Sequence, residues 1–239
     1  MKTFNFYVGV LGILSTASLL SMPLARADHH EEGVSAQTAL EELKKGNKRF
    51  VEDDVKHINQ GEDRRKKLAT GQKPHTIVLS CSDSRVAPEL LFDQGLGDLF
   101  VIRTAGNTVG SDAVASIEYA VEHLGSKLLV VMGHESCGAV KAALTTPVGH
   151  TAGSFDLDTL VGKIRPHVQG SRSLASSDKT LRVPVQDNVS AVTCNLMKRS
   201  KILREHFKKG NLTVQPAIYG LESGKVDFWD MKNCDGKKH

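Results

Sequence analysis

Two short segments of the chain bring cysteine, histidine and acidic residues together at close spacing. Residues 81–85 read CSDSR, and residues 133–138 read GHESCG. Cys81, His134 and Cys137 offer two thiolates and one imidazole, which are preferred ligands of zinc, and three such ligands leave a fourth position for water. Cys137 also precedes a predicted helix, whose dipole favours the thiolate. The sequence therefore predicts a catalytic type of zinc site, with one ion per chain.

The charged residues of the first segment admit two interpretations. Asp83 stands two residues after Cys81, so it is the one candidate within reach for a fourth ligand that would close the site. Arg85 can instead hold the Asp83 carboxylate ionised and oriented through a bidentate, charge-assisted pair. An oriented carboxylate beside a metal can accept a proton and direct a nucleophile. An ordinary salt bridge in a loop is the alternative, but the adjacent cysteine favours a functional pair.

Each segment follows an apolar run that is typical of a strand buried on both faces. These runs cover residues 76–80 and 128–132, and a third run covers residues 99–102. Residues 111–124 carry apolar side chains at helical spacing, and another helix begins near Cys137. Strands that alternate with helices indicate an α/β fold with a mainly parallel sheet flanked by helices. Ligands bind beyond the carboxyl ends of such strands, so both segments are expected at one edge of the sheet.

The flanking sequence supplies further elements. A helix is expected to begin at Ser35 as its N-cap, and residues 157–168 form a helical stretch. A long amphipathic stripe follows, formed by Val185, Val189, Val192, Leu196, Leu203 and Phe207. Residues 213–219 and 225–229 then indicate either an edge hairpin or a strand that pairs outside the main sheet.

Both segments resemble motifs of a known enzyme family. CSDSR and GHESCGAV are similar to the paired zinc motifs of β-class carbonic anhydrases. The resemblance is close over residues 36–144 and looser over residues 185–229. It implies a zinc-dependent lyase that interconverts carbon dioxide with bicarbonate and a proton.

The resemblance assigns roles to the residues of the two motifs. Cys81, His134 and Cys137 correspond to the zinc ligands. Asp83 and Arg85 correspond to a catalytic dyad that orients the zinc-bound hydroxide toward carbon dioxide.

One branch of the family closes its zinc site with the aspartate as a fourth ligand. Members of that branch tend to carry Trp three residues before the first cysteine, where this chain has Val78. Arg103, which the same branch uses, is present. An open site is therefore expected at neutral pH, with Asp83 as a metal ligand only in a closed state.

A second group of positions corresponds to substrate contacts. Gln72 and the backbone N–H of Gly138 match contacts to bicarbonate, while the wall of a small carbon dioxide pocket corresponds to Phe100, Ala105 and Tyr119. From the residues alone, Phe100 and Tyr119 are equally typical of core aromatics. In this family a neighbouring subunit usually completes the pocket, so the resemblance implies a homodimer or a homotetramer.

Three other functions fit part of the pattern. A related enzyme could hydrolyse another linear molecule, such as carbonyl sulfide, at the same zinc site. A non-catalytic zinc-binding protein would need the ligands but neither Gln72 nor the pair of Asp83 and Arg85. A metal-free hydrolase with a cysteine nucleophile would leave the second cysteine unexplained.

The first 27 residues have the pattern of an export signal. Lys2 precedes an uncharged, largely apolar run that closes on the small-x-small sequence Ala25-Arg26-Ala27. An uncleaved membrane anchor is the alternative. We expect a signal peptide over residues 1–27, a catalytic domain over residues 28–239, a periplasmic location and no stable membrane association after cleavage.

The charge balance argues against a nucleic-acid partner. The formal net charge is +4 at pH 7, and it falls to +2 without residues 1–27, which hold two basic residues and no acidic ones. Such a weak charge lacks the strong basic field of proteins that bind nucleic acids.

Two cysteines stand apart from the predicted zinc site. Cys194 lies in a predicted helix and Cys234 near the C-terminus. They can form a disulfide in an oxidising compartment or remain free thiols, and their spacing does not decide between these states.

Overall fold

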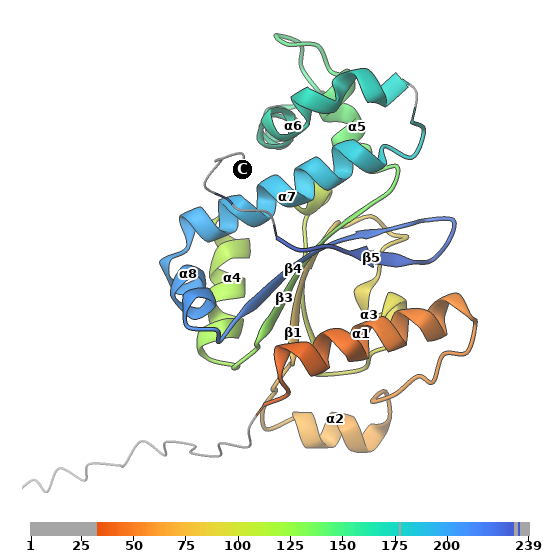
Figure 1. The fold of residues 1–239 in the computed structure, drawn as a ribbon, viewed down its shortest axis with the longest axis vertical. Helices are drawn as coiled ribbons and strands as arrows, with labels where there is room; N and C mark the ends of the chain where they lie inside the picture. Colours follow the sequence, from red (N-terminus) through yellow and green to blue (C-terminus); the bar gives the residue numbers. More distant parts are fainter. Residues whose placement is uncertain (1–32, 177, 232–233, 235–239) are drawn as a thin grey trace, which may run out of the picture. The chain divides into compact units, whose positions relative to one another are not determined.

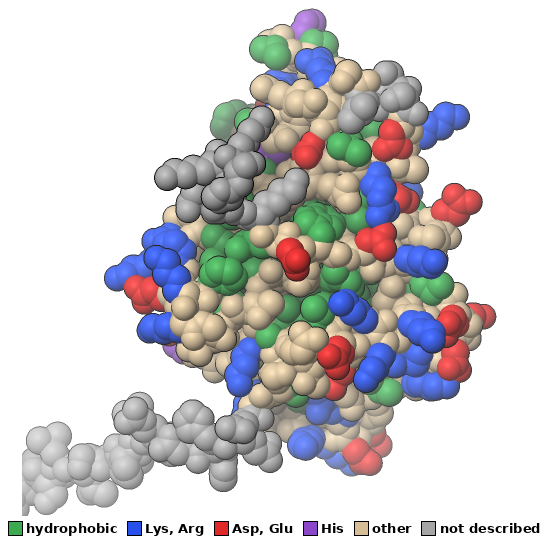
Figure 2. All heavy atoms as spheres, viewed as in Figure 1, with side chains coloured by type: hydrophobic (Ala, Val, Ile, Leu, Met, Phe, Trp, Pro, Cys, Tyr) green, Lys and Arg blue, Asp and Glu red, His purple; other side chains and the backbone are tan. Residues whose placement is uncertain are grey.

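The computed structural model describes residues 33–176, 178–231 and Cys234 (Figure 1). The predicted signal peptide, residues 1–27, lies outside the described residues. Within the described part of the chain, no helix is both long enough and apolar enough to cross a membrane. Basic and acidic side chains are mixed over the face of the molecule seen in Figure 2.

A five-stranded sheet forms the centre of the described chain. Its strands are β1 Thr76–Ser80, β2 Leu99–Arg103, β3 Leu128–His134, β4 Thr213–Tyr219 and β5 Val226–Phe228. Their spatial order is β2-β1-β3-β4-β5, in which the first four strands are parallel and β5 is antiparallel to β4. The mainly parallel α/β sheet with a C-terminal edge hairpin is thereby confirmed.

Helices cover both faces of this sheet (Figure 1). One face packs against α4 Ser111–Glu122 and α7 Arg182–Arg199, and the other packs against α1 Ala36–Val51 and α3 Pro88–Leu91. The other helices are α2 Glu62–Leu68, α5 Gly138–Thr145, α6 Phe155–Val168 and α8 Lys201–Lys208, with 3-10 turns at Ala105–Asn107 and Gln169–Ser176. As predicted, Ser35 caps α1, because its side-chain oxygen accepts the Thr38 N–H at 3.1 Å.

Alternate residues of the central strands point to opposite faces of the sheet. Ile77 and Leu79 belong to the core beneath α4 and α7, whereas Val78 belongs to the core beneath α1 and α3. Every residue of β1 and β3 is buried. The predicted burial of residues 99–102 on both faces is wrong, because β2 is an edge strand and stays partly exposed.

The predicted amphipathic stripe is two helices rather than one. α7 ends at Arg199 and α8 begins at Lys201. Ser200 breaks the helix, because its hydroxyl accepts the Leu203 N–H at 3.1 Å and donates to Glu118 at 2.6 Å. Phe207, the last member of the stripe, is 39% exposed. A helical period alone does not reveal this break, since the capping serine leaves the apolar spacing intact on both sides.

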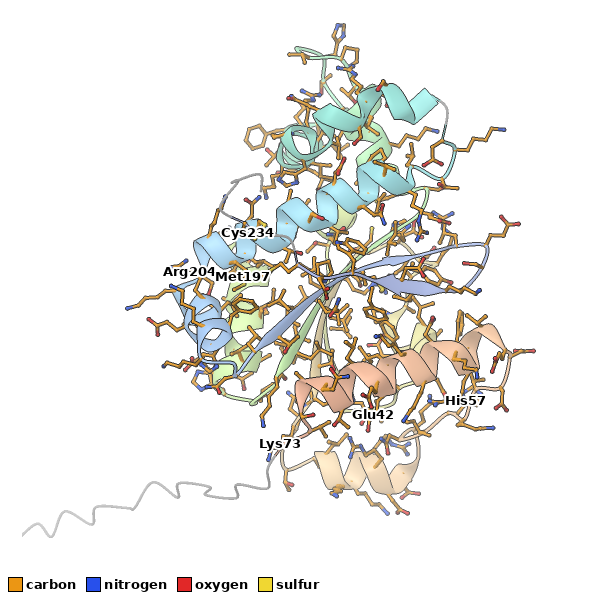
Figure 3. The ribbon with its side chains drawn as sticks, viewed as in Figure 1. Glu42, His57, Lys73, Met197, Arg204 and Cys234 are labelled. Atoms are coloured by element: carbon orange, nitrogen blue, oxygen red, sulfur yellow. A yellow bond between two sulfur atoms is a disulfide. The ribbon has the colours of Figure 1, made fainter. Side chains whose placement is uncertain are left out.

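A disulfide joins Cys194 of α7 to Cys234. Figure 3 shows Cys234 beside the C-terminal half of α7, close to Met197. The question that the sequence left open is thereby answered, and Cys81 and Cys137 are the two free thiols.

We predict that the Cys194–Cys234 disulfide stabilises the fold and leaves two titratable thiols. The two cysteines are 40 residues apart, and a cross-link over such a loop contributes about 2–4 kcal/mol by restricting the unfolded chain. The double variant Cys194→Ser/Cys234→Ser should therefore unfold at lower urea concentration than the unsubstituted protein. A reductant should lower the midpoint of the unsubstituted protein only. Four reactive thiols per chain in denatured, unreduced and chelator-treated protein would contradict the disulfide.

Candidate metal centre and active site

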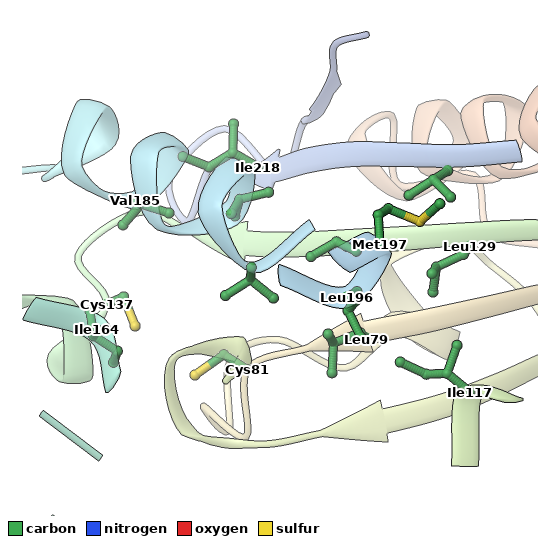
Figure 4. Packing of buried hydrophobic residues seen from close by; sticks show 14 of the residues in the cluster. Leu79, Cys81, Ile117, Leu129, Cys137, Ile164, Val185, Leu196, Met197 and Ile218 are labelled. Carbon is green, nitrogen blue, oxygen red and sulfur yellow. The ribbon is translucent and has the colours of Figure 1, made fainter. Parts of the chain in front are cut away.

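The ends of two paired strands bring the three predicted ligands together. Cys81 directly follows β1, and His134 is the last residue of β3, which pairs with β1 in parallel. Cys137 is the N-cap of α5, three residues further along the chain. One sulfur or nitrogen atom from each of these residues lies within 4.8 Å of the others, and all three residues are buried. Figure 4 shows Cys81 and Cys137 at the same end of the sheet.

His134 is oriented as a metal ligand requires. Its Nδ1 lies 2.9 Å from the carbonyl oxygen of Glu135, which can only accept, so Nδ1 carries the hydrogen. Its Nε2 is then a bare acceptor, and it has no hydrogen-bond partner among the described residues although the ring is fully buried. Buried polar atoms are nearly always paired. A metal ion at Nε2 would satisfy this atom, so the donor set fits a thiolate- and imidazole-bound cation.

The two thiols form one coupled pair. A hydrogen bond from the Cys137 thiol lowers the pKa of Cys81 to about 4, and the N–H of Gly106 also donates to the Cys81 sulfur at 3.3 Å. The pKa of Cys137 is raised, first by this bond to Cys81 and then by burial. The N–H groups at the start of the following helix act in the opposite direction and lower the pKa of Cys137, so the expected thiolate at Cys137 in a metal-bound site stays a prediction. A cation would displace the shared proton.

Asp83 and Arg85 form a bidentate pair beside the cluster. The Arg85 Nε and Nη2 donate to the two carboxylate oxygens at 2.9 Å and 2.7 Å. These bonds hold the pKa of Asp83 well below its usual range. One carboxylate oxygen also lies 3.8 Å from the Nε2 of His134. The aspartate therefore stays ionised and faces the cluster while both of its oxygens are held by arginine.

Two arginines hold the two segments in place. Arg103, the last residue of β2, donates to the carbonyl oxygens of Cys81 and Asp83 at 3.1 Å and 2.6 Å. Arg182 donates to Glu135 at 2.8 Å and also to Asp227 of β5. Arg182 and Asp227 could not be predicted from the sequence, since a lone charged residue far along the chain has no spacing that relates it to a motif. Arg103 stood out only through the family resemblance.

The structure places two predicted substrate contacts at the cluster. Gly138 is the first residue of α5, directly after Cys137, so its N–H lies in the turn whose donors have no intrahelical acceptor. Ala105 is exposed and precedes Gly106, whose N–H contacts the Cys81 sulfur.

The other three predicted substrate contacts lie elsewhere in the chain. Gln72 is exposed, lines a cavity of about 620 Å³ and precedes β1, whereas the cluster follows that strand, a length of roughly 15 Å or more. Phe100 pairs with Ile77 near the start of β1 and contacts Tyr119, with ring centroids 6.4 Å apart. Tyr119 is 48% exposed, so it is not a core aromatic. One chain alone therefore does not bring these residues to its own cluster.

Comparison with known proteins agrees with this geometry. The profile of the carbonic anhydrase family matches residues 76–226. Carbonic anhydrase 2 of Mycobacterium tuberculosis is 42% identical over 194 residues, which cover 80% of this chain and 92% of that protein. A carbonic anhydrase of Mycolicibacterium smegmatis is 40% identical over 191 residues, with 80% and 91% covered.

Solved structures give the same result. A β-carbonic anhydrase from Sordaria macrospora, described as tetrameric, matches with a TM-score of 0.61 and 29% identity, over 69% of this chain and 84% of that one. The Coccomyxa β-carbonic anhydrase in complex with acetazolamide matches with a TM-score of 0.60 and 30% identity, over 79% and 83%. With these similarities along most of its length and the metal-ligand cluster at the ends of its central strands, this chain belongs to the β class of carbonic anhydrase enzymes.

Proposed function

We propose that this chain catalyses the reversible hydration of carbon dioxide at a zinc ion held by Cys81, His134 and Cys137. The observation that carries the proposal is the buried cluster of these three residues, in which the Nε2 of His134 has no other partner among the described residues. Two sulfurs and one imidazole nitrogen favour zinc over harder cations. Family membership supports the reaction.

Each residue around the cluster has a separate role in the proposed reaction. When bound, zinc supplies an acidified water molecule as the nucleophile near neutral pH. Asp83, kept ionised by Arg85, accepts a hydrogen bond at a carboxylate oxygen and so orients that nucleophile. The Gly138 N–H donates to an oxygen of bicarbonate. Because both Asp83 oxygens are engaged by Arg85, we propose that Asp83 is a metal ligand only in a closed state.

A second subunit completes the site in this proposal. Gln72, Phe100 and Tyr119 are exposed or half-exposed and lie away from the cluster of their own chain. Placed against the cluster of a neighbouring copy, Gln72 would contact bicarbonate, and the two aromatic rings would wall the carbon dioxide pocket together with Ala105. A homodimer or homotetramer provides this arrangement, because a two-fold interface gives each site the same contribution from its partner.

We also propose that the protein works in the periplasm after removal of residues 1–27. The export pattern of these residues carries this proposal, and the Cys194–Cys234 disulfide supports it, because such bonds persist in oxidising compartments.

The first prediction for this site concerns metal and activity together. Protein purified with zinc should hold about one zinc per chain and hydrate carbon dioxide rapidly in stopped-flow assays. Cys81→Ser should lose most of the zinc and the activity, because one of three ligands is gone. The matched control, Cys194→Ser/Cys234→Ser, removes two cysteines without touching the cluster and should keep both. Full zinc without hydration at any pH from neutral to alkaline would overturn the reaction and direct attention to carbonyl sulfide.

The second prediction concerns the aspartate. Asp83→Asn removes the charge that Arg85 orients, and it should lower the hydration rate by about 100-fold or more while zinc content stays unchanged. Because the pKa of Asp83 is lowered, the carboxylate is ionised throughout pH 6–9, so this loss should be the same across that range. Asp54→Asn is the control, since Asp54 pairs with Lys56 at the same spacing of two residues but on the surface. Equal activity of the two variants would exclude a catalytic role for Asp83.

The third prediction tests whether Gln72 serves the neighbouring chain. Gln72→Ala and Cys81→Ser chains should each be impaired alone. When the two are co-expressed, each mixed dimer holds one site with an intact cluster and an intact glutamine, so random pairing restores about one quarter of the unsubstituted activity. If Gln72 acts on its own chain, mixing restores nothing above the average of the two separate variants.

A further inference from the structure

We propose that Asn188 of α7 is a positioning residue of the metal site, which acts by holding the carbonyl group of Gly106 and so fixing the conformation in which the Gly106 N–H points at the sulfur of Cys81. The inference rests on the proposed metal site and adds to it a residue outside both motifs. Among the described residues, Asn188 forms no hydrogen bond with Cys81, His134 or Cys137. It is linked to Cys81 through Gly106.

A line of hydrogen bonds runs from the surface to the Cys81 sulfur. The side-chain amide of Asn195 lies 3.2 Å from the Nε2 of His167, and the Nδ1 of His167 lies 2.9 Å from the Oδ1 of Asn188. Asn188 donates from its Nδ2 to the Gly106 carbonyl oxygen at 2.9 Å. Gly106 then donates its own N–H to the Cys81 sulfur at 3.3 Å. The links connect α6 and α7 to the loop after β1.

The direction of each bond follows from the chemistry of the groups. The Gly106 carbonyl can only accept, so the atom of Asn188 that faces it must be the NH₂ group, and its Oδ1 faces His167. Oδ1 can only accept, so the hydrogen of His167 sits on Nδ1, and Nε2 accepts from Asn195. Every donor in the line therefore points toward Cys81.

The side-chain amide of Asn188 depends on its hydrogen bonds to Gly106 and His167. Its side chain is fully buried, and a buried amide without hydrogen bonds is strongly unfavourable. Within the described part of the chain, the Nδ2 of Asn188 has one contact besides Gly106, which is longer and joins it to the Oδ1 of Asn107 at 3.5 Å. The side-chain amide is thus held by His167 on one side and by the Gly106 carbonyl oxygen on the other.

Gly106 can make both bonds because of its backbone conformation. Its φ of 62° and ψ of 26° lie in the left-handed region, which glycine adopts without strain. A β-carbon here would lie 2.7 Å from the Cδ1 of Ile164 and 3.1 Å from the Cβ of Ala139. With Asn188 on the carbonyl side and Cys81 on the N–H side, both polar groups of Gly106 are fixed. Loss of the Asn188 amide would leave that carbonyl buried without its donor, and the peptide that carries it would be held only from its other side, where the Asn107 N–H donates to the Thr104 carbonyl oxygen at 2.9 Å.

A hydrogen bond from an N–H group to a thiolate withdraws electron density from the sulfur and holds the thiolate in one orientation. Loss of a hydrogen bond to a metal-ligating atom typically changes metal affinity by about 10–100-fold. The spectrum of a cobalt-substituted protein reports the bond directly, because sulfur-to-cobalt charge transfer moves to longer wavelength when a thiolate loses a hydrogen bond.

The test compares Asn188→Leu with Thr193→Val in cobalt-substituted protein. Thr193 is equally buried on α7 and also loses a hydrogen bond, to the Val189 carbonyl, but it has no link to Gly106. Asn188→Leu should bind cobalt about 10–100-fold more weakly in chelator competition and shift the charge-transfer band to longer wavelength. Thr193→Val should change neither. His167→Phe, at a half-buried position, should shift the band in the same direction by less.

The outcomes separate this inference from the proposed function. Failure of the unsubstituted protein to bind cobalt with a sulfur charge-transfer band would overturn the metal site itself. Cobalt binding with the same band and affinity in the unsubstituted protein and in folded Asn188→Leu would overturn the role of Asn188 alone. If Asn188→Leu does not fold, the His167→Phe spectrum decides, since an unchanged band there contradicts a hydrogen-bonded line to the sulfur.

Discussion

The site depends on the parallel pairing of β1 with β3. That pairing places the carboxyl ends of both strands side by side, so the residue after β1 and the last residue of β3 become neighbours although 53 positions separate Cys81 from His134. Every residue of the two strands is buried, which fixes their register through packing on both faces of the sheet. A slip of one residue would turn His134 to the other face and separate it from the two sulfurs.

The polar groups near the carboxyl ends of these strands are held by hydrogen bonds from residues of several elements. Arg103 of β2 holds the backbone after β1, and Arg182 at the start of α7 holds Glu135 within the second motif. Asn188, further along α7, holds the carbonyl group of Gly106. A catalytic metal site needs this kind of support, because its ligands must be in place before the metal arrives and must not relax when it binds. The sheet thus supplies the positions, and the arginines and the asparagine supply the orientations.

Much of the fold could be predicted from the sequence because its signals are local. Residues 76–80 and 213–219 form strands with the predicted bounds, and the Ser35 cap starts α1 where its hydroxyl can accept a backbone N–H. The prediction failed where the outcome depends on tertiary surroundings. β2 is partly exposed because it lies at the edge of the sheet, and Ser200 breaks the last amphipathic stripe by capping a new helix.

For the site, spacing within each motif identified the three ligand candidates and the Asp83/Arg85 pair, since the residues of each motif are close in sequence. The residues that contact the motifs from far along the chain could not be predicted, because nothing in their local sequence marks Arg182 or Asn188 as neighbours of a metal cluster. Gln72 shows a different limit of prediction from the sequence of a single chain. Its place in the chain lies before β1, at the opposite end of the strand from its own cluster. The proposed assembly of subunits would reconcile that position with a contact to substrate.

The most direct test of the central claim is the zinc K-edge X-ray absorption spectrum of the zinc-loaded protein in solution. An open site held by Cys81, His134 and Cys137 predicts two sulfur scatterers at about 2.3 Å, with an imidazole nitrogen and one further light atom at about 2.0 Å. A spectrum with no sulfur, or with one sulfur per zinc, would contradict the cluster as the metal centre and with it the mechanism built on its geometry.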